Sequence, residues 1–195
     1  LSAFCGHCEY CLTGQMSLCQ EPELQRKGDE TPRLAQEGTP IAQFLNLSSF
    51  AEYMLVHEHA VAKIREDMPL DRAALIGCGV TTGVGAVIHT AAVEPGSTVA
   101  VIGCGGVGLS CINGAEIAGA SRIIAVDTLA SKLELARKFG ATDVVNAADN
   151  DPVEAVRELT GGGVHYAFEA IGLKVTTEQA FKMIRAGGCA TVIGM

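Results

Sequence analysis

The sequence predicts an α/β fold, a doubly wound parallel sheet preceded by a smaller, mainly β region with a metal-binding lobe. Three observations predict it: strand-like runs alternate with helix-like segments from about residue 79 onward, a glycine-rich turn follows the first of these strands, and four cysteines fall within the first 20 residues. We therefore expect two domains, 1–78 with the lobe in 1–20, and 79–195.

Five apolar runs read as strands and begin at Thr98, Arg122, Asp143, Val164 and Cys189. Helix-like segments separate them: one opens at Asp151-Pro152 and stops at Gly161, and another, SKLELARKF, ends at Gly140. Strands that alternate with helices indicate a parallel sheet covered on both faces. Earlier in the chain, AEYMLVHEHAVAKI has apolar residues at every second position, which predicts strands there.

The turn TVAVIGCGGVGLS places Gly103, Gly105 and Gly108 in a G-x-G-x-x-G pattern between a strand and a helix. Such glycines let the backbone approach a pyrophosphate at the helix N-terminus. Asp127 ends the next strand, 127 − 108 = 19 residues further on, where an acidic residue binds the ribose hydroxyls. A carboxylate there repels a 2′-phosphate, so the pattern favours NAD over NADP. The alternative is a plain glycine turn with Asp127 at a solvated strand end; the spacing and both flanking elements favour the dinucleotide.

The opening segment has the spacing C-x2-C-x2-C-x7-C, formed by Cys5, Cys8, Cys11 and Cys19. Disulfides fit poorly with three thiols placed so close together. An iron–sulfur cluster is a closer rival, but that motif has its fourth cysteine three residues on, followed by proline. Four thiolates suit Zn²⁺ in a closed, structural site. We therefore expect structural zinc.

The charge balance is acidic, with a net charge of −8, and no Lys/Arg-rich run occurs. Nucleic acid is therefore not an expected partner, because phosphate binding needs clustered positive charge. The longest apolar run that we identify is strand-sized, and the first residues lack a signal-peptide pattern, so we expect no membrane partner and a cytoplasmic location. The chain begins with Leu1 and ends at Met195, and we interpret it as a piece of a longer protein.

Together these motifs resemble the zinc-dependent medium-chain alcohol dehydrogenases. The resemblance rests on the cysteine lobe, GCGVTTGVGAV, VIGCGGVG and the following Asp, and it covers essentially the whole chain. The segments GASRIIAVD, FGATDVVNA and GGGVHYAFEAIG look most like the class III branch, the glutathione-dependent formaldehyde dehydrogenases. The resemblance implies a partial GroES-like catalytic domain followed by a Rossmann domain that is incomplete at its C-terminus.

The resemblance also implies roles for individual residues. The four lobe cysteines match the structural zinc ligands; Cys78 matches a catalytic zinc ligand, and Thr82 the hydroxyl residue beside the nicotinamide. The other matched positions contact NAD: the pyrophosphate turn Gly103, Gly105, Gly106, Val107 and Gly108, the ribose pair Asp127 and Lys132, Ile171 near the adenine, and Ile193 against the nicotinamide. The family places His57 and His59 on a solvated strand rather than at the metal.

The implied activity is oxidation of a primary alcohol or an S-hydroxymethyl-thiol adduct by hydride transfer to NAD, in a homo-oligomer. The family's two other catalytic zinc ligands, a Cys and a His, lie upstream of the lobe, so we expect this fragment itself to be inactive. The alternative is a non-enzymatic module that binds zinc and a nucleotide on the same fold.

Overall fold

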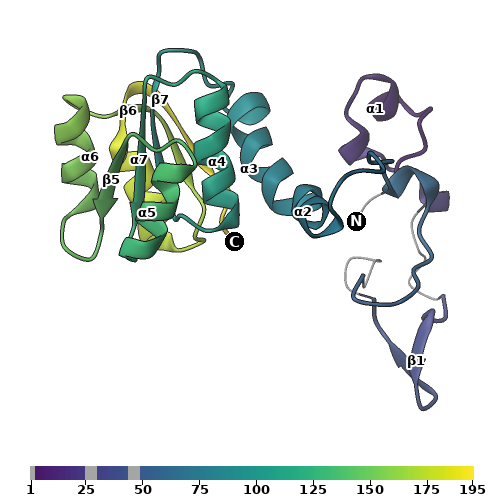
Figure 1. Cartoon of the computed structure of the whole chain (residues 1–195). Helices are drawn as coiled ribbons and strands as arrows, with labels where there is room; N and C mark the ends of the chain where they lie inside the picture. The colour runs from purple at the N-terminus through teal and green to yellow at the C-terminus, as the bar shows by residue number, and fades with distance from the viewer. Residues whose placement is uncertain (1–2, 25–29, 44–48) are drawn as a thin grey trace. The chain divides into compact units, whose positions relative to one another are not determined.

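The computed structural model describes residues 3–24, 30–43 and 49–195 (Figure 1). The chain divides into two compact units, Leu1–Asp67 and Met68–Met195. The sequence analysis placed the border at residues 78 and 79 instead. The two borders differ because Leu70–Thr90 is one continuous helical run that packs on α4 (Gly106–Ile117) and so belongs to the second unit.

The second unit is built on a five-stranded parallel sheet with the order β5-β4-β3-β6-β7. Its strands are β3 (Thr98–Ile102), β4 (Arg122–Asp127), β5 (Asp143–Asn146), β6 (Val164–Glu169) and β7 (Ile184–Val192). The central strand β3 is almost completely buried from Val99 to Ile102, as expected where both faces of a sheet are covered. The predicted α/β class with a parallel sheet is confirmed, although β7 begins before the expected Cys189.

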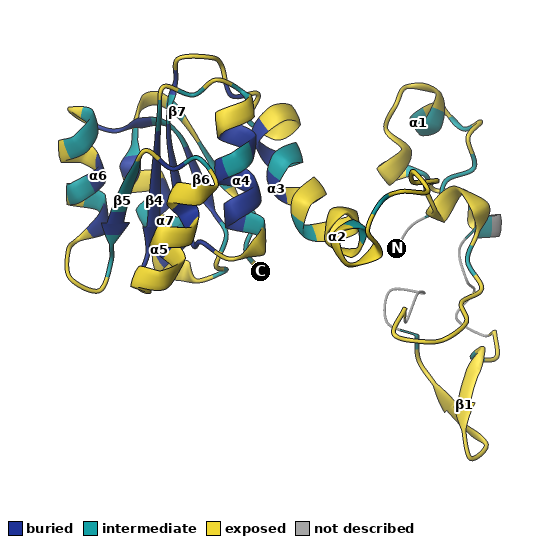
Figure 2. Cartoon of the chain, in the orientation of Figure 1, coloured by how far each residue is buried: buried dark blue, intermediate teal, exposed yellow. Residues whose placement is uncertain are grey.

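Helices cover both faces of this sheet (Figure 2). One apolar cluster joins the sheet to α4 (Gly106–Ile117) and α5 (Ala130–Lys138), and a second joins it to α6 (Pro152–Thr160) and α7 (Lys174–Met183). The ends of α6 follow the sequence signals: Asp151 Oδ1 accepts hydrogen bonds from Val153 N at 2.8 Å and Glu154 N at 3.1 Å, and Gly161 adopts a left-handed φ of 66°.

The helical run before the sheet consists of α2 (Leu70–Leu75), the π-helical turn η5 (Ile76–Val80), α3 (Thr81–Gly85) and a second π-helical turn η6 (Ala86–Thr90). The run has 21 residues, and an 18-residue stretch within it has a mean hydropathy of 1.5. It is therefore long and apolar enough to cross a membrane, so the expectation that the longest apolar run is strand-sized was wrong. Its second half packs on α4: a Cβ at Gly83 would lie 2.5 Å from Ser110 Cβ. A core helix meets the same length and composition criteria, so the run by itself is weak evidence for a membrane span.

The first unit consists of short elements: α1 (Glu9–Leu12), η1 (Met16–Leu18), η2 (Pro22–Leu24), a hairpin of β1 (Leu34–Gln36) and β2 (Thr39–Ile41), and η4 (Glu58–Ala60). None of its described side chains is buried. The strands expected in 51–64 are not formed among the described residues, and Met54 and Ile64 are exposed. An alternating pattern yields a strand only where a second strand pairs with it, and no such pairing occurs here in the described segments.

Candidate metal lobe and nucleotide site

Four cysteine side chains converge in the first unit. The Sγ atoms of Cys5, Cys8, Cys11 and Cys19 all lie within 4.8 Å of one another. Cys8 Sγ is 3.5 Å from Cys11 Sγ and 3.9 Å from Cys19 Sγ, and Cys5 Sγ is 3.9 Å from Cys11 Sγ. A tetrahedral zinc ion with Zn–S bonds of about 2.3 Å holds its sulfurs about 3.8 Å apart. The cluster therefore fits a single tetrahedral ion.

The same distances bear on the two rival interpretations. All four thiols are free, so no disulfide joins them. An iron–sulfur cluster places several iron and sulfide ions between its cysteines, which keeps the thiolates further apart than ligands that share one ion. The geometry therefore favours a mononuclear site.

Backbone N–H groups of the loop point at the sulfurs. Cys5 N donates to Cys19 Sγ and Cys8 N donates to Cys5 Sγ, each at 3.3 Å. A hydrogen bond from the backbone of His7, supported by the one from Cys8, lowers the pKa of the Cys5 thiol to about 6. Burial raises the pKa of the Cys11 thiol to about 11. The loop thus stabilises one thiolate by itself, and a bound cation would stabilise the others.

His59 contacts this lobe from a distant part of the chain. Its ring stacks on Phe4, with centroids 4.7 Å apart and an interplanar angle of 13°. Its Nδ1 lies 2.5 Å from the Phe4 carbonyl oxygen, which can only accept, so Nδ1 carries the proton. The residue is on η4 rather than on a strand, and it contacts Phe4, the residue that precedes Cys5.

The glycine turn occupies the carboxyl end of β3, and each glycine meets a different constraint. Gly103 has φ 93°, and a Cβ at Gly108 would lie 1.7 Å from the Gly103 carbonyl oxygen. Gly105 and Gly106, in contrast, face open space at the start of α4. Val107 packs half-buried on the apolar cluster. The turn therefore combines tight strand-to-helix packing with a bare backbone at a helix N-terminus, as a bound pyrophosphate requires.

Asp127 ends β4 beside this turn and is only 7% exposed. Its Oδ2 accepts a hydrogen bond from Cys104 N at 2.9 Å, and its Oδ1 accepts one from Leu129 N at 3.0 Å. Lys132 Nζ lies 3.9 Å from Oδ2. These contacts exclude the solvated strand end that was the alternative to a ribose-binding carboxylate. A carboxylate has about four lone-pair positions, so capacity remains for two hydroxyl donors.

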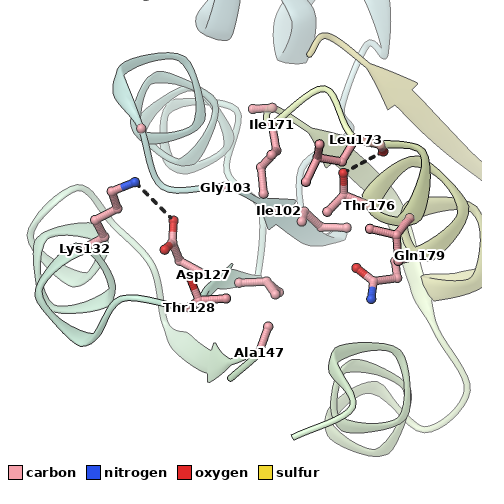
Figure 3. Close-up of a pocket in the computed structure, with 14 residues that line it drawn as sticks. Ile102, Gly103, Asp127, Thr128, Lys132, Ala147, Ile171, Leu173, Thr176 and Gln179 are labelled. Atoms are coloured by element: carbon pink, nitrogen blue, oxygen red, sulfur yellow. Dashed lines mark hydrogen bonds and ion pairs between the residues drawn. The ribbon is translucent and has the colours of Figure 1, made fainter. Parts of the chain in front are cut away.

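A cavity of about 520 Å³ opens at the carboxyl ends of the strands (Figure 3). Asp127 and Lys132 lie on one side of it, and Ile171 lies on the other, close to Gly103. Strand order reverses direction at β3, between β4 and β6, which is where doubly wound sheets bind their ligands. The cavity thus brings five of the predicted residues together: Gly103, Gly105, Asp127, Lys132 and Ile171.

Sequence reasoning missed several residues of the cavity wall. They follow the ends of β4, β5 and β6 or lie on α7, and they are Thr128, Ala147, Ala170, Leu173, Val175, Thr176 and Gln179. Thr128, Ala147 and Ala170 each follow directly after a strand, and this position was a signal that could have found them. Thr176 and Gln179 on α7 carry no such signal. Ile193 does not line the cavity, but its N donates to the Glu169 carbonyl at 2.8 Å, directly beyond the wall.

Cys78 and Thr82 lie on the helical run, Cys78 in η5 and Thr82 in α3, and both side chains are exposed. Thr81 Oγ1 donates to the Ile76 carbonyl at 2.6 Å within the π-helical turn. Single π-helical turns are frequent at functional sites, because they displace side chains from the regular helical register. Among the described residues Cys78 joins no group of potential metal ligands, so its role as a ligand stays a prediction.

Comparison with known proteins agrees with this architecture. Residues 106–195 match the sequence model of the family described as zinc-binding dehydrogenase. The alcohol dehydrogenase zinc-binding domain protein from Burkholderia ambifaria is 37% identical with a TM-score of 0.83, over 100% of this chain and 55% of that one. Benzyl alcohol dehydrogenase from Acinetobacter calcoaceticus is 38% identical with a TM-score of 0.84, over 100% of this chain and 54% of that one. Alcohol dehydrogenase TADH from Thermus sp. ATN1 is 29% identical with a TM-score of 0.72, over 99% of this chain and 53% of that one.

This chain thus spans about half the length of the solved structures that it resembles. Residues 106–195 are similar to the zinc-binding dehydrogenase family, and the whole chain shares the fold of the corresponding part of alcohol dehydrogenases.

Proposed function

We propose that this chain is part of a zinc-dependent alcohol dehydrogenase that uses NAD. The observation that carries the proposal is the cavity at the carboxyl edge of the sheet, where the bare glycine turn and the buried Asp127 carboxylate face the same space. A pyrophosphate fits the turn, and an adenosine ribose with free 2′- and 3′-hydroxyls fits the carboxylate. Asp127 disfavours NADP because its charge would lie against a 2′-phosphate.

Each of the predicted site residues has a distinct role in this proposal. The four lobe cysteines hold a structural zinc, and Cys78 contributes one thiolate to a catalytic zinc whose other ligands we expect upstream. A zinc held there would supply Lewis acidity that lowers the pKa of an alcohol, and NAD would supply the hydride acceptor. Thr82 orients the reacting oxygen, while Ile171 and Ile193 shield the cofactor from water.

The substrate class that we propose is a primary alcohol, with S-hydroxymethyl-thiol adducts as a second candidate. The name of the Acinetobacter relative, benzyl alcohol dehydrogenase, supports the first. The class III-like segments, such as GGGVHYAFEAIG, favour the second. We further propose a cytoplasmic homo-oligomer that binds neither nucleic acid nor membrane, in keeping with the net charge of −8.

The proposal is tested by titrating the purified chain with NAD, NADP and ADP-ribose in a calorimeter, and by measuring zinc per chain. We expect NAD and ADP-ribose to bind, NADP to bind at least about tenfold more weakly, and about one zinc per chain to be retained. Equal binding of NAD and NADP would contradict the role of Asp127. Nucleotide and zinc binding without alcohol oxidation by the longer protein would favour the non-enzymatic module.

A further inference from the structure

Glu169 is a fully buried carboxylate beside the cavity, at the end of β6. Its Oε1 accepts hydrogen bonds from Ile171 N and Gly172 N, both at 2.8 Å, and from Thr176 Oγ1 at 2.7 Å. These three donors belong to the segment between β6 and the first turn of α7, which forms one wall of the cavity. A single oxygen atom, Glu169 Oε1, therefore holds the conformation of the segment that forms this wall.

The backbone of Glu169 holds a second loop in the same way. Its carbonyl oxygen accepts from Ile193 N at 2.8 Å and from Gly194 N at 3.2 Å, just after β7. The two loops touch backbone to backbone, since a Cβ at Gly194 would lie 2.0 Å from Gly172 N. Ile171 and Ile193, the two apolar residues expected to face the cofactor, are thus each one hydrogen bond away from Glu169.

A carboxylate at this position is chemically unusual. Its other oxygen, Oε2, is buried and has no hydrogen-bond partner among the described residues. Burial of a charged group is unfavourable unless strong hydrogen bonds compensate for the lost water. Compensation comes from the Ile171 and Gly172 amides and from the Thr176 hydroxyl, whose single proton is shared with the Leu173 carbonyl oxygen at 2.8 Å. Hydrogen bonds to a charged acceptor are about twice as strong as neutral ones. The negative charge of Glu169 therefore stabilises the conformation of the loop that supplies these donors.

We propose that Glu169 is a positioning residue of the nucleotide site, where it holds the loops of Ile171 and Ile193 in their binding geometry before the ligand arrives. This inference rests on the proposed nucleotide-binding function. A site whose walls are ordered in advance loses less conformational freedom on binding, which raises affinity. Without the hydrogen bonds to Glu169 the loops spend part of their time in other conformations. The apparent affinity for the nucleotide then falls in proportion to the population of the binding geometry that is lost.

The direct test is Glu169→Gln, which keeps one acceptor oxygen but removes the charge and places two N–H donors where no acceptor lies. If the binding geometry falls to about a tenth of the population, the Kd for ADP-ribose rises about tenfold. Thr176→Val removes one of the three donors and should give a smaller rise in the same direction. ADP-ribose, titrated by calorimetry, is the probe.

The matched control is Val164→Ala. Val164 is equally buried and lies on the same strand, at the amino end away from the cavity, so its truncation lowers stability without touching the loops. Amide hydrogen exchange at Ile171 and Gly172, which donate to the Glu169 side chain, provides a readout that is independent of any nucleotide. Ile193 donates to the Glu169 backbone carbonyl, which the variant keeps, so its amide is the internal reference. We expect Glu169→Gln to speed exchange at Ile171 and Gly172 about tenfold or more relative to Val164→Ala.

The outcomes separate the two proposals. A tenfold loss of ADP-ribose affinity in Glu169→Gln, with wild-type affinity in Val164→Ala at a similar loss of Tm, supports positioning. Equal affinity losses in both variants, or unchanged exchange at Ile171 and Gly172, would overturn it. Should Glu169→Gln fail to fold, Thr176→Val against Val164→Ala decides by the same criteria. A wild-type chain that binds no ADP-ribose would instead overturn the nucleotide function, and the exchange data would still show whether Glu169 holds the loops.

Discussion

Two alanine substitutions in the glycine turn should separate folding from nucleotide binding. At Gly108 a Cβ would lie 1.7 Å from the Gly103 carbonyl oxygen, whereas a carbon–oxygen contact needs roughly 3.3 Å, so the two backbones must part by roughly 1.6 Å. Overpacking of this kind costs about 3 kcal/mol. For a chain of this size Tm moves by about 2–4 °C per kcal/mol, so Gly108→Ala should lower Tm by about 6–12 °C.

At Gly105 the same methyl group meets nothing within 4 Å, and φ of −80° suits any residue. The weaker capping by alanine, about 0.5–1 kcal/mol, is offset by a similar gain from the stiffer unfolded chain. Tm should therefore stay within about 2 °C of wild type. The methyl group projects where the pyrophosphate would approach, so the Kd for ADP-ribose should rise about tenfold or more.

The assays are thermal unfolding by circular dichroism and calorimetric titration of both variants. If Gly105→Ala lowers Tm as much as Gly108→Ala does, the distinction between the packed and the open glycine is refuted. If Gly105→Ala binds ADP-ribose as tightly as wild type, the pyrophosphate does not lie on this turn.

Four further predictions address the ribose contact, the metal lobe and the sheet edge. Asp127→Ser should narrow the NAD-to-NADP affinity ratio by about tenfold or more in calorimetric titration, because the repulsive charge is gone. A chelator should unfold the first unit, because none of its described side chains is buried and it has no core of its own to replace the metal. The cooperative unfolding transition of the sheet domain should persist in circular dichroism. His59→Ala should speed zinc release to a chromogenic chelator about tenfold, whereas His7→Ala should leave the rate near wild type. Burial opposes ionisation of Asp143, but hydrogen bonds from Thr142 and Arg122 outweigh it and hold the pKa of this carboxyl below its ordinary value. The stabilisation that Asp143 provides is therefore present above about pH 4 and is lost on further acidification. Arg122→Ala should flatten that part of the curve when the free energy of unfolding is measured against pH.

Much of the sheet domain could be predicted because its signals are local. The run from Val99 to Ile102 is apolar because both faces are covered, and Asp151 and Gly161 mark the two ends of one helix by their own chemistry. The cysteine lobe is local as well, since its four cysteines lie within fifteen residues and a short loop suffices to bring them together. In each case the residues that form the sequence pattern are the same residues that make the stabilising contact in the fold.

The predictions that were wrong or incomplete concern features that depend on contacts between distant parts of the chain or that no continuous run reveals. The alternating segment around Met54 and Ile64 predicts a strand, but strand formation depends on a pairing partner elsewhere in the chain. The apolar residues of Leu70–Thr90 are spread along a helix rather than gathered in one run, so a search for continuous apolar stretches passed over them. Thr176 and Gln179 reach the cavity only because α7 starts beside the carboxyl end of β6, which no local pattern in α7 reveals.

Glu169 shows why a buried charge at a strand end is informative once the topology is known. In the sequence FEAIG it reads as a polar residue that closes an apolar strand, which is the normal place for a solvated carboxylate. In the fold, β6 lies between β3 and β7, so the same carboxylate is enclosed on both sides and has to find its donors in the adjoining loops. Asp127, at the end of β4, is enclosed in the same way and accepts from the backbone of the glycine turn. Both acidic strand ends therefore organise the loops around one cavity, and only Asp127 keeps contact with the space where a ligand would bind.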